Sequence, residues 1–333
     1  MKKYKFTYQK SGVNINASNQ FIKYISKLTK KGNSKNKFKN IGSFGSINEI
    51  PKKFNNPLLV SSTDGVGTKL ELLLEHDLLE IAGKDLVAMS INDIITTGAD
   101  PIMFLDYVGV GKLDKSQISR VISGIVDWCE ACDCILAGGE TAEMPGLVGD
   151  DMIELSGFGI GAAEKSDVVD PTSIAEGDVF VGYPSDGIHA NGWSLVRKIL
   201  SQYPNEFNDE DVVSLLATTR LYHDVLSGYR DMGIKPKAMA HITGGGLEEN
   251  LSRINSSYTM IIDRDKCKLK GIFLEIMKLG NITRNEMYKV FNCGIGFCLI
   301  LDREDVEKAK KINSKLFEIG YVSKTEKKFI FKN

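Results

Sequence analysis

Apolar and polar positions along the chain follow both helical and strand periodicities. In residues 114–132, Ile118, Val121 and Ile125 recur at the spacing that places side chains on one face of a helix. Residues 77–100 show the same spacing and end at a Gly followed by a Pro. Shorter apolar runs bounded by Gly, Pro or Asn predict strands. The pattern therefore indicates a protein built from both element types.

The remaining elements follow from the same patterns. Further helices are expected at 19–31, 192–202, 212–232, 247–254, 271–279 and 303–318. Strands are expected at 55–63, 101–111, 134–144, 152–164, 179–183, 237–243, 258–263, 288–301 and 327–332. The Gly-rich run in 152–164 loosely matches a dinucleotide-binding fingerprint. It has no clear helix start behind it, so we interpret it as a strand.

A chain of 333 residues is long for one hydrophobic core, which favours two domains. Residues 164–178 are polar and interrupted by Pro and Gly, as expected of a junction. We predict domains at 1–168 and 169–333, each a mixture of helices and strands. The expected fold class is α+β or α/β, with a mixed sheet and helices in the C-terminal domain.

Composition indicates an ordinary globular protein, with 42% apolar and 26% charged residues. A net charge of −1 offers no reason to expect nucleic acid or an anionic membrane as a partner. No apolar run approaches the roughly 18 residues of a membrane span, and the N-terminus lacks a signal-peptide core. We therefore expect a cytoplasmic protein. Cys129, Cys132 and Cys134 are interpreted as buried small residues, with metal binding as the less favoured alternative.

The first stretch with chemical interest is Asp64-Gly-Val-Gly-Thr-Lys69, at the end of a predicted strand. The order of its residues excludes a Walker A loop. Glycine lets backbone approach a ligand, Asp can hold a hard cation, and Lys can meet phosphate oxygens. An ordinary Asp-Gly turn is an equally good interpretation of this stretch alone.

Three other stretches share this layout of a strand end or turn with acids or glycines. They contain Asp93, Glu140 with Thr141, and Thr243 with the glycines 244–246. Asp64, Asp93 and Glu140 together suggest magnesium ligands, although each alone is more simply a cap or a surface acid. The consecutive glycines precede a predicted helix and could bind phosphate, or could be a flexible turn.

Two histidines are candidates for chemistry. His189 lies in a Gly-rich loop with Asn191 just before a predicted helix, a setting suited to acid–base or phosphate-binding roles. Asn191 is equally well explained as a helix cap. His241 precedes the three glycines and would face the same cleft.

The motifs TDGVGTK, GGETAEMPG, HANGWSLVRKIL, AHITGGG and EMYKVFNCGIG occur in this order along the chain. Together they closely resemble the phosphoribosylformylglycinamidine cyclo-ligase family, from about Tyr8 to the C-terminus. The resemblance implies ATP- and Mg2+-dependent closure of formylglycinamidine ribonucleotide to aminoimidazole ribonucleotide, through a phosphorylated formyl oxygen, in purine biosynthesis. It also implies a homodimer whose N-terminal domains pair strands across the interface.

The resemblance further implies roles for individual residues. Magnesium would be held by Asp64, Asp93 and Glu140. ATP would contact Gly42, Phe44, Gly45, Asp64, Gly65, Gly67, Thr68, Lys69, Asp106, Glu140 and Thr141. The substrate or its phosphate would face His189, Asn191, Thr243, Gly244, Gly245 and Gly246. Lys69, His189 and His241 are the candidates for catalytic groups.

Two departures from the family pattern and two alternatives accompany this hypothesis. The covering loop carries Ser43 where the family usually has Gly, and Asn14 and Asn16 replace acids. A relative with the same fold, such as selenophosphate synthetase, thiamine-phosphate kinase or a formylglycinamidine synthetase fragment, would carry out different chemistry. A nucleotide-binding regulatory protein would be expected to lack some of Asp64, Lys69, Asp93 and Glu140, and all four are present.

Overall fold

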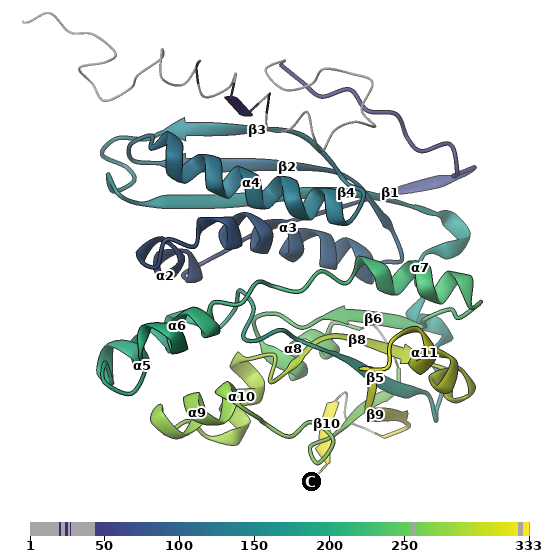
Figure 1. The fold of residues 1–333 in the computed structure, drawn as a ribbon. Helices are drawn as coiled ribbons and strands as arrows, with labels where there is room; N and C mark the ends of the chain where they lie inside the picture. Colours follow the sequence, from purple (N-terminus) through teal and green to yellow (C-terminus); the bar gives the residue numbers. More distant parts are fainter. Residues whose placement is uncertain are drawn as a thin grey trace, which may run out of the picture.

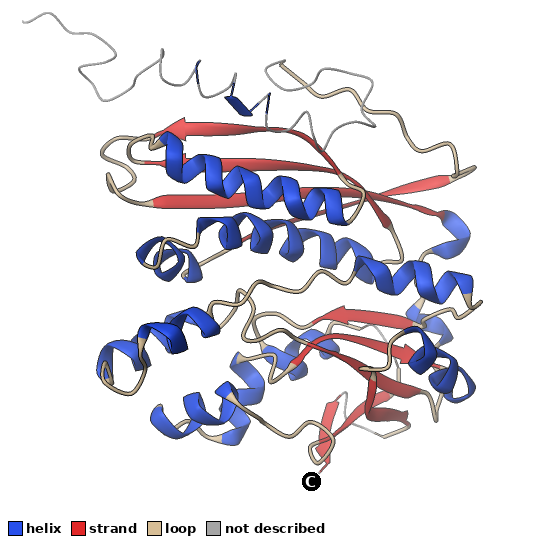
Figure 2. Ribbon diagram, in the orientation of Figure 1, coloured by secondary structure: helices blue, strands red, loops and turns tan. Residues whose placement is uncertain are grey.

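The chain forms two β-sheets with a long helix, α3 (Leu79–Thr96), between them (Figures 1 and 2). The computed structural model describes residues 20, 24, 25, 27, 44–254, 257–325 and 329–332. The predicted positions Asn14, Asn16, Gly42 and Ser43 lie outside these described residues. Within them, no helix is both long and apolar enough to cross a bilayer.

The N-terminal sheet has four strands in the order β1-β4-β2-β3. Their bounds are β1 (Pro57–Gly65), β2 (Asp100–Val110), β3 (Ile135–Glu143) and β4 (Ile153–Glu164). Strand β4 pairs antiparallel with β1 and β2, and β2 pairs parallel with β3. The strands predicted at 55–63, 101–111, 134–144 and 152–164 are confirmed as β1, β2, β3 and β4.

One face of this sheet is covered by α3 and by α4 (Lys115–Ala131) (Figure 2). Close packing explains the glycines of β4, because a Cβ atom at Gly159 would lie 2.7 Å from Cδ1 of Ile94 on α3. Gly161 is similarly close to Ile94. The Gly-rich run is therefore a strand that lets a helix approach closely, as interpreted, and not a dinucleotide-binding turn.

The opposite face of the N-terminal sheet carries exposed apolar side chains. Leu59 is 65% exposed and Phe158 is 44% exposed. The strand register places Phe158 between Thr63 of β1 and Leu105 of β2. Large apolar groups left exposed on a sheet face commonly mark an interaction surface.

The C-terminal sheet has six strands in the order β10-β7-β9-β5-β8-β6. Their bounds are β5 (Val179–Pro184), β6 (Ala238–His241), β7 (Thr259–Asp263), β8 (Ile295–Leu301), β9 (Phe317–Ser323) and β10 (Phe329–Lys332). The remaining α-helices are α2 (Lys69–Glu75), α5 (Trp193–Gln202), α6 (Asp209–Leu215), α7 (His223–Asp231), α8 (Gly246–Ser252), α9 (Ile272–Leu279), α10 (Arg284–Val290) and α11 (Val306–Ile312). Parallel and antiparallel pairs occur together, so the predicted mixed sheet is confirmed.

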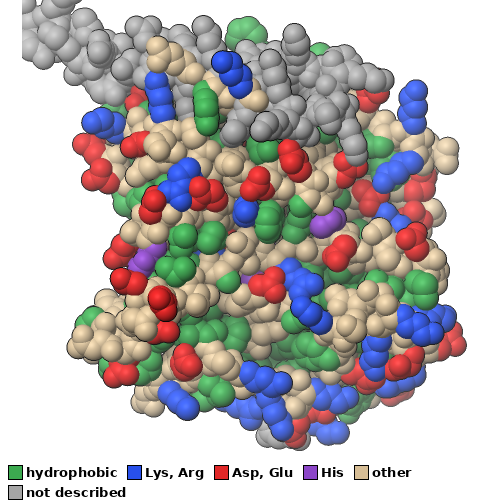
Figure 3. All heavy atoms as spheres, in the orientation of Figure 1, with side chains coloured by type: hydrophobic (Ala, Val, Ile, Leu, Met, Phe, Trp, Pro, Cys, Tyr) green, Lys and Arg blue, Asp and Glu red, His purple; other side chains and the backbone are tan. Residues whose placement is uncertain are grey.

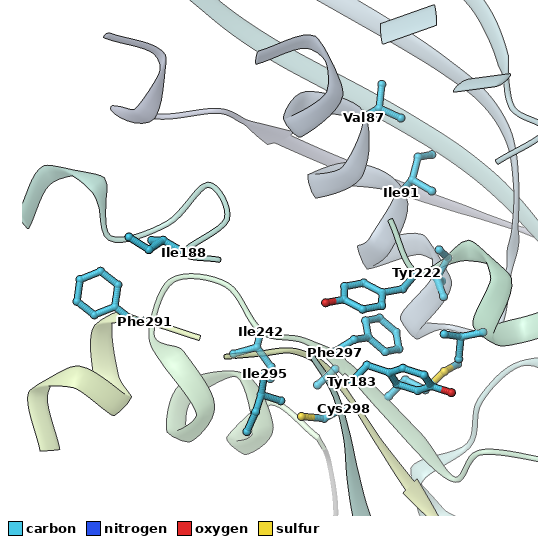
Figure 4. Packing of buried hydrophobic residues seen from close by; sticks show 14 of the residues in the cluster. Val87, Ile91, Tyr183, Ile188, Tyr222, Ile242, Phe291, Ile295, Phe297 and Cys298 are labelled. Carbon is cyan, nitrogen blue, oxygen red and sulfur yellow. The ribbon is translucent and has the colours of Figure 1, made fainter. Parts of the chain in front are cut away.

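Helix α3 contributes to the cores of both domains. Buried residues lie on every side of it, as expected for a helix enclosed between two layers. Figure 4 shows Val87 and Ile91 on the side of α3 away from the buried Tyr222 and Phe297 of the C-terminal half. Ile91 faces β4, since a Cβ atom at Gly159 would lie 3.3 Å from its Cδ1. The hydrophobic core is thus continuous from one sheet to the other.

The prediction of one helix over 212–232 is wrong. The chain forms α6, then crosses beneath α3 as a non-helical segment, residues 217–222, and forms α7 (Figure 1). The backbone groups of this crossing segment bond to side chains of α3 instead of to a helical ladder. Asn92 accepts a hydrogen bond from N of Tyr222 at 2.9 Å and donates one to O of Arg220 at 2.8 Å. These tertiary contacts override the local helical pattern.

One other predicted element is divided in the structure, and two elements were missed. The stretch 288–301 was predicted as one strand, but its first residues end α10 and a turn separates them from β8. Cys293 in that turn has φ of +51°, and Gly294 has φ of +91°, which breaks the strand. Helix α2 and strand β9 were not predicted, because each is short and its pattern is weak.

A buried ion pair anchors the crossing segment. Nζ of Lys69 lies 2.7 Å from Oδ2 of Asp85 on α3, and neither side chain is exposed. Lys69 also donates to O of Ala217 at 2.7 Å. Asp85 accepts a hydrogen bond from N of Thr219 at 2.6 Å. Burial lowers the pKa of Lys69, and the neighbouring Asp85 carboxylate opposes that change.

Removing one member of this pair should strongly destabilise the fold. Asp85→Asn leaves the Lys69 ammonium without a counter-charge, and we expect a loss of about 3–5 kcal/mol in the free energy of unfolding. Urea denaturation measures the loss. Glu307→Gln, which removes an exposed partner of Lys310, should leave the free energy of unfolding nearly unchanged. Equal losses in the two variants would contradict the anchoring role.

Candidate active site

Two of the predicted metal ligands meet where the domains join. Asp64 near the end of β1 faces α3, and its carboxylate interacts electrostatically with Asp93 of that helix. Ser62, two residues earlier on the same face of β1, has its Oγ 3.5 Å from Oδ2 of Asp93. The two acids are separated by 29 positions in the sequence. The fold therefore brings together two acids that the sequence offered as candidate ligands of one cation.

His241 completes this cluster from the C-terminal domain. It ends β6, and its Nδ1 lies 3.0 Å from Oδ1 of Asp93. Its Nε2 lies 3.4 Å from Nδ2 of Asn92, so the ring is held at both nitrogens. The His241 side chain is 1% exposed whereas that of Asp93 is 42% exposed. Asp93 can therefore reach a ligand while His241 orients it from behind.

The electrostatics of the cluster suit a cation. Burial raises the pKa of Asp64, the Asp93 carboxylate raises it further, and a hydrogen bond from N of Gly65 opposes the rise. Two carboxylates that destabilise each other's charge gain most from a divalent cation between them. Within the described residues, no three His, Cys, Asp or Glu side chains form a metal-binding group. Asp64 and Asp93 could together hold a divalent cation.

A cleft of about 480 Å³ opens beside this cluster. It lies between the end of α3, strand β6 and helix α8. Its walls include Asp93, His241, Thr96, Asn250 and Arg253. The cluster thus borders a space of the size that small-molecule ligands occupy.

Lys69, predicted to meet phosphate, has its partners inside the protein. Its ammonium lies against Asp85 and O of Ala217, and 5.7 Å from the Trp193 ring centre. The side chain has no exposed surface. The structure therefore does not bring Lys69 to the cleft, and its contact with ATP stays a prediction.

His189 is also enclosed. The residue is 1% exposed, and its Nε2 accepts hydrogen bonds from N of Asp186 at 3.2 Å and N of Arg220 at 3.4 Å. Burial lowers the pKa of His189 well below its usual value, and nearby positive groups lower it further. A neutral ring that accepts two backbone hydrogen bonds braces its loop against the crossing segment. A catalytic role for His189 stays a prediction.

The glycine loop 244–246 lies beside Asn191. A Cβ atom at Gly244 would be 3.3 Å from Oδ1 of Asn191, so the predicted substrate groups from two loops are brought together. Gly245 and Gly246 have φ of +89° and +59°, and a Cβ at Gly246 would lie 1.9 Å from O of Tyr288. These glycines are required by backbone shape and packing, whatever ligand they also meet.

Glu140 is not brought to the Asp64–Asp93 pair. Asp64 and Asp106 both pair with Gly157, whose Cβ position faces α3, so these two acids lie on the helix-covered side of the sheet. Asp106 pairs with Gly139, and Glu140 is the next residue along β3, on the opposite side. Within one chain, the geometry does not support three acids around one magnesium ion.

The other predicted nucleotide contacts occupy different places. Gly67 has φ of +65°, and Thr68 stands at the N-cap position of α2 without a side-chain cap hydrogen bond. Phe44 is fully exposed, and among the described residues no atom beyond the chain neighbours lies within 4 Å of a Cβ built at Gly45. Thr141 is half-buried on β3, and Thr243 donates from Oγ1 to Oδ1 of Asn250 at 3.3 Å. Their contacts with ATP or substrate stay predictions.

Sequence reasoning missed two asparagines that shape the site. Asn250 donates from Nδ2 to O of Gly246 at 2.7 Å and to O of Gly244 at 3.1 Å. Asn292 donates to O of Gly187 at 2.9 Å and to O of Ile188 at 3.0 Å. Both are buried, so each holds one of the two candidate substrate loops. Asn292 directly follows the apolar Val290 and Phe291, which was an available signal, whereas Asn250 lies among polar residues and offered none.

Comparison with known proteins agrees with this architecture. Residues 53–163 match the family model for the N-terminal domain of AIR synthase related protein, and residues 175–333 match that for the C-terminal domain. The fold and the paired carboxylates thus define a two-domain protein of the AIR synthase related class.

Two similar proteins show which family within this class the chain belongs to. A phosphoribosylformylglycinamidine cyclo-ligase from Caldanaerobacter subterraneus is 42% identical, with 96% of this chain and 98% of the relative covered. That of Thermodesulfovibrio yellowstonii is 41% identical, with 96% of each covered. The chain belongs to the phosphoribosylformylglycinamidine cyclo-ligase family.

Solved structures share the fold at low sequence identity. Hydrogenase maturation protein HypE in complex with ATP has a TM-score of 0.68 and 16% identity, over 96% of this chain and 89% of that chain. Thiamine-monophosphate kinase from Stenotrophomonas maltophilia has a TM-score of 0.64 and 16% identity, over 88% and 90% of the two chains. These likenesses show a common architecture.

Asp106 should make stability depend on pH. Burial raises its pKa from 3.8 to about 7, so the folded state keeps a proton that the unfolded state releases. Stability from this group is present below pH ~4 and is lost as pH rises through about 7, by at most roughly 4 kcal/mol. Asp106→Asn should remove this loss in urea denaturation between pH 4 and 8. The exposed Asp151→Asn should follow the wild type, and parallel profiles for Asp106→Asn would contradict the assignment.

Proposed function

We propose that this chain catalyses the ATP-dependent closure of formylglycinamidine ribonucleotide to 5-aminoimidazole ribonucleotide, releasing ADP and phosphate. Family membership over nearly the whole chain supports the reaction. The observation in the structure that carries the proposal is the Asp64–Asp93 pair, held by His241 beside a cleft at the domain junction.

The chemistry needs activation of a poor leaving group. The formyl amide oxygen attacks the γ-phosphorus of ATP, the bond to the bridging oxygen breaks, and ADP leaves. The amidine nitrogen then attacks the former formyl carbon and loses a proton. The carbon–oxygen bond breaks and phosphate departs. Both steps depend mainly on positioning two phosphate-bearing molecules and on neutralising charge.

Asp64 and Asp93 would hold magnesium, which neutralises phosphate charge when it is bound. Asp93 is oriented by His241, and Ser62 lies within hydrogen-bonding distance of its other oxygen. A carboxylate fixed at both oxygens keeps its position when a ligand arrives. We assign His241 to positioning Asp93 in addition to any contact with substrate.

The substrate would lie against the two loops that carry Asn191 and the glycines 244–246. Asn250 and Asn292 hold the carbonyls of these loops, which leaves the exposed edges of the loops free to meet a ribose phosphate. Lys69 and His189 would act from behind these loops, because their polar atoms bond to the crossing segment. Glu140 would meet the nucleotide from the other face of the N-terminal sheet, and Thr141 from the helix-covered face that also carries Asp106.

The assay for this proposal measures ADP release with ATP and Mg2+, with and without formylglycinamidine ribonucleotide. We expect ADP only when the substrate is present, with an equal amount of aminoimidazole product. Asp64→Asn should lower kcat by at least about 100-fold, because loss of one electrostatic group costs about 2.7–4 kcal/mol. Asp151→Asn serves as the control and should retain activity.

Other outcomes of this assay separate the alternatives. ADP formation without the substrate, or only with thiamine monophosphate or selenide, would reject the ring closure and leave the fold intact. An unchanged rate for Asp64→Asn would reject the proposed magnesium pair while leaving the overall reaction standing.

We also propose that the chain forms a homodimer through the face of the N-terminal sheet opposite α3 and α4. The exposed Leu59 and Phe158 on that face support this proposal. Glu140 lies on the same face and would then be near the partner chain. This would explain how Glu140 can contact a nucleotide although it points away from Asp64.

Phe158→Asp should convert the dimer to a monomer, because it buries a charge in an apolar interface. Sedimentation velocity measures the change in mass. Val213→Asp, at a similarly exposed apolar position on α6, should remain dimeric. A monomeric wild type, or a dimeric Phe158→Asp variant, would contradict the proposed interface.

A further inference from the structure

A second cavity, of about 630 Å³, lies in the C-terminal domain. None of its lining residues belongs to the candidate active site, and no residue role predicted from the sequence involves it. The lining residues are Pro184, Lys266, Cys267, Lys268, Lys270, Gly271, Ile272, Phe273, Cys293, Gly294, Ile295 and Phe317. We refer to it as the lysine cavity.

The charge of the lysine cavity is positive. Lys266, Lys268 and Lys270 line it, and no Asp or Glu is among its described lining residues. Nζ of Lys266 is 3.5 Å from Glu318 and Nζ of Lys268 is 4.0 Å from Asp265, so both ion pairs are long. Such exposed pairs contribute little and give way readily to a better anion. Figure 3 shows that Lys and Arg side chains are numerous over the C-terminal domain on the face it displays.

Lys270 is the most available of the three cations. Among the described residues, no ion pair is found for it. It also stands just before α9, whose first residues, Ile272 and Phe273, line the same cavity. The positive end of the helix therefore adds to the field of the lysines.

The rest of the cavity wall is apolar and firmly placed. Phe273 is 6% exposed and Ile295 is 1% exposed, and Phe273 packs edge-on against Phe291 with ring centroids 6.4 Å apart. Gly294 leaves room beside Phe273, since a Cβ built there would have its nearest neighbour at 3.9 Å. A rigid apolar floor of this kind accommodates a flat ring.

We propose that the lysine cavity binds a phosphate ester of a planar heterocycle, the chemical class of the nucleoside monophosphates. The phosphate would be neutralised by the lysines and the start of α9, while the ring would lie on the apolar floor. A purely apolar ligand would leave three cations unused, and inorganic phosphate alone would leave the floor empty. Small-molecule sites commonly combine an apolar wall with a few charged groups in this way.

Pyridoxal 5′-phosphate is a suitable probe, because it combines a flat ring, a phosphate and an aldehyde. The aldehyde condenses with a lysine amine, losing water, and borohydride reduces the imine to a stable amine. Peptide mass spectrometry then locates the label. We expect Lys266, Lys268 or Lys270 to be labelled about tenfold more than the exposed Lys112, Lys165 and Lys198, as one charge-assisted contact would give. AMP should suppress this labelling more than inorganic phosphate or adenosine does.

One variant and its control test the apolar wall of the lysine cavity without removing a lysine. Ile272→Trp fills the cavity and should reduce labelling of the three lysines to the level of the exposed ones. Met232→Trp, at a 43% exposed position elsewhere, should leave it unchanged. Circular dichroism checks that both variants fold. Uniform labelling of all lysines, or selective labelling that neither AMP nor Ile272→Trp reduces, would overturn the proposal.

Discussion

The relation between the two domains depends on a few buried polar contacts made by one helix. Lys69 and Asp85 form an ion pair with no exposed surface, and both also bond to the backbone of the crossing segment 217–222. Asn92 makes two further backbone contacts seven residues along α3. Such groups are costly to bury without partners, so only the domain arrangement that satisfies all of them is stable.

This constraint places the candidate active site. The face of α3 that carries Asp85 and Asn92 meets the C-terminal domain, and Asp93 adjoins that face, next to β1. Asp64 comes from one domain and His241 from the other, so the cluster exists only while the domains are joined. A cation that binds between the two carboxylates then relieves their mutual repulsion. Helix α3 therefore supplies both the contacts that stabilise the domain junction and one of the carboxylates of the site.

Several residues of motifs that suggest function make contacts that stabilise the fold. The glycines of β4 admit α3, and Gly246 admits the backbone of Tyr288. His189 has a left-handed backbone conformation, with φ of +65°, and braces its loop through backbone donors. A motif can therefore persist because it shapes a site without touching the ligand. The buried asparagines, Asn250 and Asn292, hold the loops in the same way.

The sequence by itself determined most elements, because periodic apolar positions report directly which face of a helix or strand is buried. Its motifs also indicated the family, the strand at 152–164 and the acids Asp64 and Asp93. Only the tertiary structure decided that 217–222 crosses α3 without forming a helix, since that depends on side chains more than a hundred positions away. It also decided that Lys69 is enclosed and that Glu140 lies on the other face of its sheet from Asp64. Burial and strand register are set by long-range packing, which a local pattern does not encode.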